Sequence, residues 1–314
     1  MLEILSLVIP FFAVIGCGYA GARLIGETGQ RGINNLVLYF ALPTLLFAMM
    51  ARSDIGTRFQ GDFVTAYTSV SLVLFAVAFA TVKLLFRPRR GEAAVHAMGA
   101  VYGNTGYMGI PIVVTMLGQS ASVPIVVSLI IDLAIMVPLT AAIVESDDPR
   151  GNRSVAHGAM SALRGTIRNP LILASALGAA WSLAALPIPV MLGGFLDLLG
   201  AAAAPCALFA MGCSLYGKPL GGTLSPALLI SVFKLVIHPI VLWFALTWIW
   251  TIDPEWTKPA LIAASLPVAV TVYVVARQYN TLVVSTSTTI LVSTSLSLVS
   301  VPVFLLLLDR LPGI

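Results

Sequence analysis

Long apolar runs constrain this chain more than any other feature of its sequence. Ten segments each approach or exceed the roughly 20 residues that an α-helix needs to cross a bilayer. Only 10% of the residues are charged, against about 25% in soluble domains, and the mean hydropathy is +0.99. The chain is therefore expected to be an all-α integral membrane protein. The ten segments are 3–22, 32–51, 62–86, 94–117, 121–145, 169–188, 191–216, 225–250, 257–279 and 283–308.

The remaining composition excludes several classes of site. Cys17, Cys206 and Cys213 lie in apolar segments, and their odd number and spacing argue against a disulfide framework or a zinc site. We therefore expect no metal and no cofactor. Glu3 is the only charge in the first run, so this run is not a cleavable signal. The net charge of +4 does not indicate nucleic-acid binding, because the basic residues lie at segment ends.

The basic residues predict the orientation in the membrane. Twelve of the 17 lie in the odd-numbered loops, and Lys234 lies inside a segment. Positively charged loops stay in the cytoplasm, so both termini are expected outside it, in a multi-pass protein of the cell (inner) membrane. The four basic residues of the opposite side are Arg52, Arg58, Lys258 and Arg310.

The fourth segment contains the stretch Gly103–Pro111, with three glycines, a proline and Asn104. Glycine and proline weaken a helix interior, and proline removes a backbone donor. In hydrocarbon such a break is tolerated only where it is buried in protein or lines a cavity. Broken helices near the midplane are the usual substrate sites of secondary transporters, so this stretch is predicted to form one.

The chain contains an internal repeat. Residues 43–49 and 205–211 share the pattern P-x-x-L-F-A-M, and a second break is expected at Ser265–Pro267, in the ninth segment. Five segments per half require the halves to have opposite orientation, as in the inverted repeats of transporters. The two broken helices would then cross, and their N-termini would favour an anion such as a carboxylate.

At these residues the chain resembles the auxin efflux carrier family, which includes the plant auxin exporters. The resemblance runs from about Ile9 to Leu308 in five ordered pieces. They are Gly32-Ile33-Asn34-Asn35 with Ala41-Leu42-Pro43, Asn104-Thr105-x-x-Met108-Gly109-Ile110-Pro111, Arg168-Asn169-Pro170 with Trp181-Ser182-Leu183, Leu266-Pro267, and Ala276-x-x-Tyr279-Asn280.

This resemblance implies a fold similar to bile-acid symporters and sodium/proton antiporters. Residues 1–57 and 169–217 would form a scaffold that carries a homodimer surface, and 58–145 and 223–309 a moving transport domain. Residues 146–168 would form a cytoplasmic loop. The family's substrates are small organic anions, moved by an elevator-like alternation. The implied substrate-binding residues, with neighbours expected in the same pocket, are Asn104, Thr105, Gly106, Tyr107, Pro111, Pro267 and Thr271.

Two departures make this site more apolar than in the plant exporters. Val268 stands where those proteins have a glutamine, and Leu46 stands where they have a polar residue. Auxin itself is therefore not implied as the substrate, and backbone amides are expected to carry more of the anion recognition.

Charged residues inside the membrane are expected to have a partner or a function, because inserting each one costs roughly 2.5–3.5 kcal/mol of free energy. Asp132 lies midway along 121–145, and Lys234 and His238 share one face of 225–250. We expect Asp132 and Lys234 to face each other and to couple transport to protons or ions. The alternatives are a fixed structural pair, a Lys234 that snorkels to the interface, and a His238 that satisfies a carbonyl freed by Pro239.

Other intramembrane polar residues have structural readings. Asp197 is expected to cap or pair near a break. The last segment carries small polar residues on one face, which favours close helix packing over the lining of a wet pathway. They are Thr286, Thr289, Ser293, Ser297 and Ser300.

The sequence thus predicts a secondary transporter for a small organic anion in the lipid bilayer. The alternatives are a sodium- or proton-coupled carrier of an ion or other metabolite, and a channel. A channel would need rings of charge or a filter motif, which the sequence lacks. An enzyme is not expected, because the chain has no H-E-x-x-H or G-x-G-D pattern.

Overall fold

The computed structural model describes residues 2–147, 160, 163–217, 224–308 and 310–314. Within these residues the regular elements are helices, and strand-like pairing is confined to one isolated bridge. Six helices of this described part are long and apolar enough to cross a membrane. The chain is therefore an all-helical, multi-pass membrane protein. The six are Ile9–Ala51, Gly61–Phe86, Ser122–Ser146, Val190–Leu215, Leu224–Ile249 and Val283–Leu308.

The ten predicted segments correspond to helices, although several are merged or divided. The 43-residue run Ile9–Ala51 covers the first two, and Gly26 interrupts it with a positive φ of 65°. The segments 94–117 and 257–279 are each divided into two helices. A count of ten crossings stays a prediction, because the divided helices are too short to span by themselves. The predicted loop 146–168 lies largely outside the described residues.

The chain divides into two compact units, and each is described by itself. Unit 1 comprises residues 1–60, 106–127 and 168–217, and unit 2 comprises 61–105, 128–167 and 218–314. The elements η2 (Thr105–Gly109) and α7 (Ser122–Ile131) contribute residues to both units. The other helices of unit 1 are α1 (Leu2–Leu36), η1 (Val37–Ala41), α2 (Leu42–Ala51), α3 (Ile55–Arg58), α6 (Ile110–Leu117), η3 (Gln119–Ala121), α10 (Pro170–Leu183), α11 (Val190–Ala201) and α12 (Ala203–Leu215).

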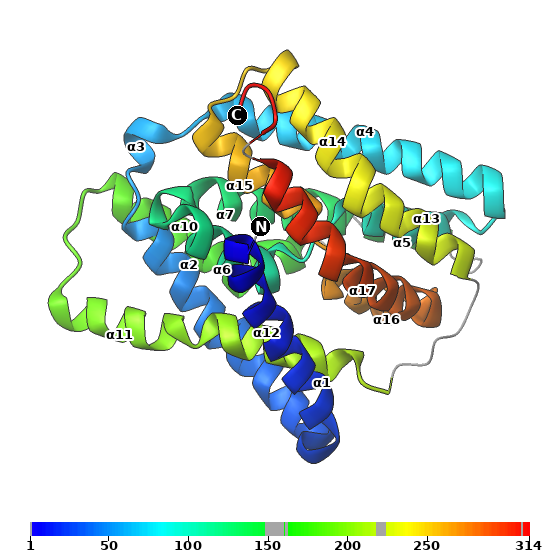
Figure 1. Ribbon diagram of the computed structural model, residues 1–314, viewed down its shortest axis with the longest axis horizontal. Helices are drawn as coiled ribbons and strands as arrows, with labels where there is room; N and C mark the ends of the chain where they lie inside the picture. Colours follow the sequence, from blue (N-terminus) through cyan, green and yellow to red (C-terminus); the bar gives the residue numbers. More distant parts are fainter. Residues whose placement is uncertain (1, 148–159, 161–162, 218–223, 309) are drawn as a thin grey trace. The chain divides into compact units, whose positions relative to one another are not determined.

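Glycines bring the helices of unit 1 into close contact. Helices α1 and α12 lie side by side, as do α2 and α10 (Figure 1). A Cβ atom on Gly18 of α1 would collide with the carbonyl oxygen of Phe209, and one on Gly178 of α10 with that of Phe47. Small residues that let backbones approach are typical of helix packing in membranes. Phe47 and Phe209 occupy the same position of the sequence repeat, so the two contacts are equivalent.

Unit 2 is built around α5 (Arg90–Val101), which is buried throughout from Ala93 to Val101. A helix that is apolar on all sides belongs in a protein core. Helix α5 packs against α4, α8 and α13, and α17 packs against α13 and α16. The helices of this unit are α4 (Gly61–Phe86), α5, η4 (Asp132–Met136), α8 (Val137–Ser146), α13 (Leu224–Val232), η5 (Phe233–Ile237), α14 (His238–Phe244), η6 (Ala245–Ile249), α15 (Pro254–Ser265), α16 (Val270–Gln278) and α17 (Val283–Leu308).

Candidate functional site

The first helix break of unit 2 is short. Helix α5 ends at Val101, the backbone is not helical from Tyr102 to Asn104, and η2 begins at Thr105. The break is therefore narrower than the predicted Gly103–Pro111. Pro111 lies beyond the break, inside the continuous helix that η2 and α6 form over Thr105–Leu117.

The second break lies between α15, which ends at Ser265, and α16, which begins at Val270. Leu266, Pro267, Val268 and Ala269 connect the two helices. Both breaks are buried: Asn104 is 2% exposed and Val268 is fully enclosed. Each break therefore holds backbone polar groups that have neither a helical partner nor water.

The two breaks satisfy each other. Gly103 and Val268 form an antiparallel bridge. The N–H of Asn104 donates to the carbonyl of Pro267 over 2.9 Å, and the N–H of Ala269 donates to the carbonyl of Tyr102 over 3.1 Å. Buried backbone groups must be paired, and here two short segments far apart in the sequence provide the partners. The predicted substrate residues Asn104, Thr105 and Pro267 thus lie at one place in unit 2.

Helix α17 adds a third element to this pairing. The N–H of Val268 donates to Ser293 Oγ over 3.2 Å. The predicted small polar face of α17 is buried, with Thr286, Thr289, Ser293 and Ser297 all at most 3% exposed. The sequence favoured packing for this face, and Ser293 has in addition a hydrogen-bonding task.

Gly103 has no room for a side chain. A Cβ atom there would lie 2.7 Å from the carbonyl oxygen of Ala263 and 3.0 Å from Cε and Nζ of Lys234. Three segments therefore meet at this residue: the first break, the end of α15 and η5. Glycine is required here by close approach.

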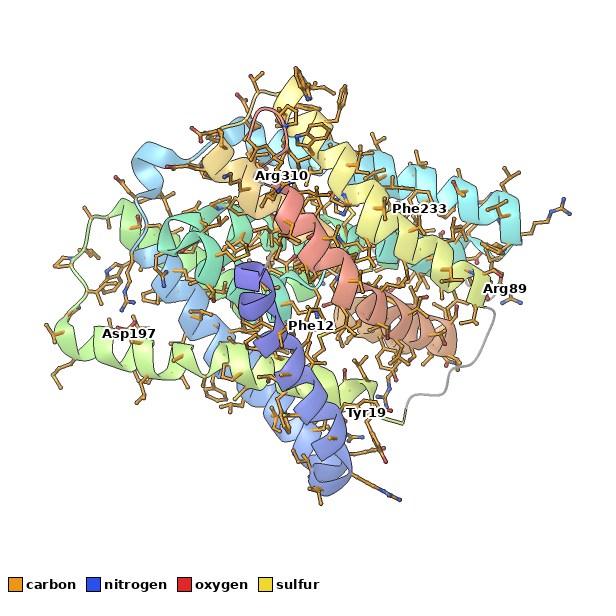
Figure 2. All side chains as sticks on the ribbon, in the orientation of Figure 1. Phe12, Tyr19, Arg89, Asp197, Phe233 and Arg310 are labelled. Atoms are coloured by element: carbon orange, nitrogen blue, oxygen red, sulfur yellow. The ribbon has the colours of Figure 1, made fainter. Side chains whose placement is uncertain are left out.

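Lys234 lies fully buried on η5. It follows Phe233, the residue of η5 that Figure 2 labels. Its Nζ atom donates to the carbonyl of Ala264, lies 3.4 Å from that of Ala263, and lies 3.1 Å from Nδ1 of His238. The snorkelling alternative is therefore wrong for this lysine. The predicted proximity of Lys234 and His238 is observed, and His238 contacts the ammonium group.

Asp132 is also fully buried, but it does not form an ion pair with Lys234 in the described part of the chain. Tyr67 of α4 places its hydroxyl 3.4 Å from Asp132 Oδ2, and its ring centroid lies 6.5 Å from that of His238. Among the described residues, Asp132 Oδ1 and His238 Nε2 have no hydrogen-bond partner.

Three predicted site residues belong to unit 1, which begins again at Gly106. Gly106 and Pro111 are buried, and Tyr107 is partly buried with its hydroxyl 3.5 Å from Asn34 Oδ1. Thr271 lies in unit 2, in the first turn of α16, and is partly buried. The apolar substitution Leu46 is fully enclosed in unit 1.

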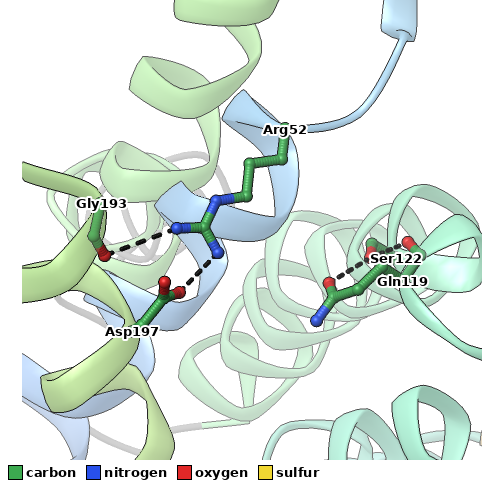
Figure 3. Close-up of polar contacts among 5 residues, drawn as sticks. All are labelled: Arg52, Gln119, Ser122, Gly193 and Asp197. Atoms are coloured by element: carbon green, nitrogen blue, oxygen red, sulfur yellow. Dashed lines mark hydrogen bonds and ion pairs between the residues drawn. The ribbon is translucent and has the colours of Figure 1, made fainter. Parts of the chain in front are cut away.

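Asp197 has a structural explanation in unit 1. Arg52, which directly follows α2, places Nη1 2.5 Å from Asp197 Oδ1, and its Nη2 donates to the carbonyl of Gly193 over 3.5 Å (Figure 3). The side chains are 39% and 62% exposed, so solvent screens the ion pair and it adds little stability. The sequence leaves capping and pairing open for Asp197, and the structure shows pairing, with Arg52.

Comparison with known proteins decides the family. The sequence profile described as "Membrane transport protein" matches residues 3–305. The chain belongs to this membrane transport family. The resemblance to the auxin efflux carriers is thereby confirmed.

Three relatives of this transporter cover most of its length. It is 34% identical over 303 residues to a Rhizobium meliloti (strain 1021) protein named "Putative malonate transporter", covering 96% of this chain and 94% of the relative. It is 25% identical to the "Uncharacterized transporter YfdV" of Escherichia coli (strain K12), covering 87% of each chain. An "Uncharacterized transporter" of Methanothermobacter thermautotrophicus is 24% identical, covering 90% of each.

Sequence reasoning missed three residues of this transporter's polar centre. Tyr67 carried no signal, since one tyrosine in an apolar helix is most often a packing residue. The carbonyls of Ala263 and Ala264 belong to alanines, which no side-chain pattern reveals. The one sequence signal for these acceptors is Pro267: a helix that ends before this proline leaves its last carbonyls without helical partners.

Proposed function

We propose that this protein is a secondary active transporter for a small organic anion, of the class of malonate-like dicarboxylates. The observation that carries this proposal is the backbone pairing of two buried helix breaks in a member of a transporter family. Membrane proteins tolerate such breaks where protein or a cavity surrounds them, and transporters use them as substrate sites. The name of the 34% identical relative supports the dicarboxylate class.

Backbone groups and Asn104 provide most of the recognition in this proposal. The helices restart at Thr105 and Val270, and unpaired N–H groups at a helix N-terminus favour a carboxylate. Val268 and Leu46 provide no side-chain donor. Thr271 lies in the first turn of α16, where its hydroxyl can supplement the amides. Thr105 and Pro267 of unit 2 belong to the same proposed binding set. For Gly106, Tyr107 and Pro111 of unit 1, substrate binding stays a prediction from the family resemblance.

The proposed architecture is ten crossings in two inverted repeats, with the broken fourth and ninth helices crossing. The equivalent close contacts of Phe47 with Gly178 and of Phe209 with Gly18 support the repeat. In this scheme residues 1–57 and 169–217 form a dimeric scaffold, and 58–145 and 223–309 move as an elevator. Both termini lie outside the cytoplasm.

Proton coupling through Asp132 is the second part of the proposal. Its carboxyl group is enclosed, has one oxygen without a partner in the described residues, and lies beside Tyr67. A carboxyl group with an unsatisfied oxygen in a dry site gains by holding a proton. His238 and Lys234 lie in the same polar cluster, so they can respond to this proton.

A thermal-shift screen of small mono- and dicarboxylates on the purified protein tests the substrate class. The screen is repeated at two pH values, with and without sodium, and each stabilising compound is then tested for uptake in proteoliposomes. Malonate or a close analogue is expected to raise the melting temperature and to be taken up with saturation. Failure of every carboxylate would refute the anion proposal, and turnover at channel-like rates would refute a carrier.

A further inference from the structure

The ammonium group of Lys234 lies in a small cage of acceptors at the end of α15. Its neighbours are the carbonyl oxygens of Ala263 and Ala264 and the Nδ1 atom of His238. An ammonium has three N–H donors, and this cage presents three acceptors. The charge is therefore satisfied without a carboxylate in direct contact.

The charged form of Lys234 requires one state of His238. With Lys234 as an ammonium, Nδ1 of His238 accepts its hydrogen bond, which requires a neutral ring with the proton on Nε2. A neutral imidazole and two carbonyls are all uncharged ligands. The single formal charge in this cage is the one that Lys234 brings.

Such a set of acceptors is suited to a monovalent cation. The last carbonyls of a helix have no intrahelical partner and carry the negative end of the helix dipole. Helix α15 ends at Ser265, so Ala263 and Ala264 supply two of these end carbonyls, and that of Ala263 also accepts from the N–H of Leu266 over 3.4 Å. In transporters with broken helices, carbonyls at half-helix C-termini and in unwound backbone coordinate the coupling sodium ion or proton.

We propose that Lys234 fills a monovalent-cation site with its own ammonium group, so that the chain carries this cation covalently and does not bind sodium there. The proposed cation site is argued only from the contacts of Lys234. Its consequence, transport without sodium, rests on the proposed transport function. The tethered charge also lies beside the paired breaks, because Nζ is 3.0 Å from the position of a Cβ on Gly103. It is thus placed to offset the charge of an anion.

Two variants distinguish the effect of an empty cage from the effect of losing the lysine charge. Lys234→Ala removes the aliphatic stem and the ammonium and opens the cage to a soluble cation. Lys234→Met removes the charge but keeps a chain of similar length, so the cage stays filled. The melting temperature of each purified protein is measured in sodium, choline or propylammonium chloride at equal ionic strength. Propylammonium replaces the atoms that the alanine variant lacks.

We expect wild-type protein to melt at the same temperature in sodium and choline. The alanine variant should be stabilised by several degrees in propylammonium or sodium, and the methionine variant in neither. Stabilisation of the wild type by sodium, or an alanine variant that folds but responds to no cation, would overturn the proposal.

A direct measurement covers the case in which the alanine variant does not fold. Binding of radioactive sodium to the wild type is expected to be absent, and saturable binding that the methionine variant loses would place sodium at Lys234 and refute the tethered cation. A second assay compares carboxylate uptake with and without sodium. Uptake in both would support the consequence, and uptake only with sodium would refute it. Absence of uptake in either condition concerns the proposed function alone.

Discussion

Replacing Gly103 by alanine introduces a methyl group where three segments of unit 2 meet. The new Cβ atom would lie 2.7 Å from the carbonyl oxygen of Ala263 and 3.0 Å from Nζ of Lys234. An ordinary contact begins near 3.4 Å, so the carbonyl must move by roughly 0.7 Å. This carbonyl belongs to the backbone of α15 and cannot rotate away as a flexible side chain could.

The expected cost follows from this overlap. Overpacking a tight core costs about 1–3 kcal/mol, and each kcal/mol lowers the melting temperature by roughly 2–4 °C in a protein of 150–250 residues. We therefore expect Gly103→Ala to melt several degrees below wild type and to lose transport, because the shift also strains the bridge to Val268. Gly61→Ala is the matched control, since a Cβ atom there meets nothing within 4 Å.

The assay is thermal unfolding of the purified variants in detergent, followed by uptake in proteoliposomes. Equal melting temperatures and uptake for Gly103→Ala and Gly61→Ala would refute the close approach of the three segments. A stable Gly103→Ala protein without uptake would keep the role of the break in transport but refute the steric estimate.

Three further predictions address other contacts. Ser293→Ala leaves the buried N–H of Val268 without its partner and should lower the free energy of unfolding by about 1–3 kcal/mol. The exposed Ser295→Ala is the control and should change it little. Equal effects of the two substitutions in thermal unfolding would show that this hydrogen bond does not stabilise the protein. Asp132→Asn should flatten the pH dependence of uptake in liposomes, and an unchanged profile with normal rates would make Asp132 structural. Gly212→Ala places a methyl group against the Ile15 carbonyl and should lower the melting temperature as Gly103→Ala does, whereas Gly16→Ala, with open space, should not.

The sequence was sufficient where a residue type dictates the backbone. Pro267 cannot continue a helix without losing a hydrogen bond, and Gly103 gives the chain a site of close approach, so both breaks were predictable. The sequence also assigns Pro111 to the break, but the helix that begins at Thr105 continues through this proline. The sequence alone does not say where the new helix begins.

The side-chain contacts depended on information that the sequence does not carry. A lysine and an aspartate in neighbouring apolar helices suggested a direct pair, yet Lys234 points to the carbonyls at the end of α15 and Asp132 to Tyr67. Which acceptor a buried ammonium reaches depends on helix rotation and on where each helix ends. The periodicity of a helix predicts which face is buried, but it does not predict whether a lysine on that face contacts a carboxylate or a backbone carbonyl.

The central claim is that the substrate binds at the paired breaks, next to Asn104. Affinity of wild type and Asn104→Ala for the best carboxylate, measured calorimetrically on purified protein with equal melting temperatures, tests this most directly. A lost hydrogen bond to a charged group costs about 1.5–3 kcal/mol, so we expect binding roughly 10- to 100-fold weaker in the variant. Wild-type affinity in a correctly folded Asn104→Ala protein would contradict the claim and place the substrate site elsewhere.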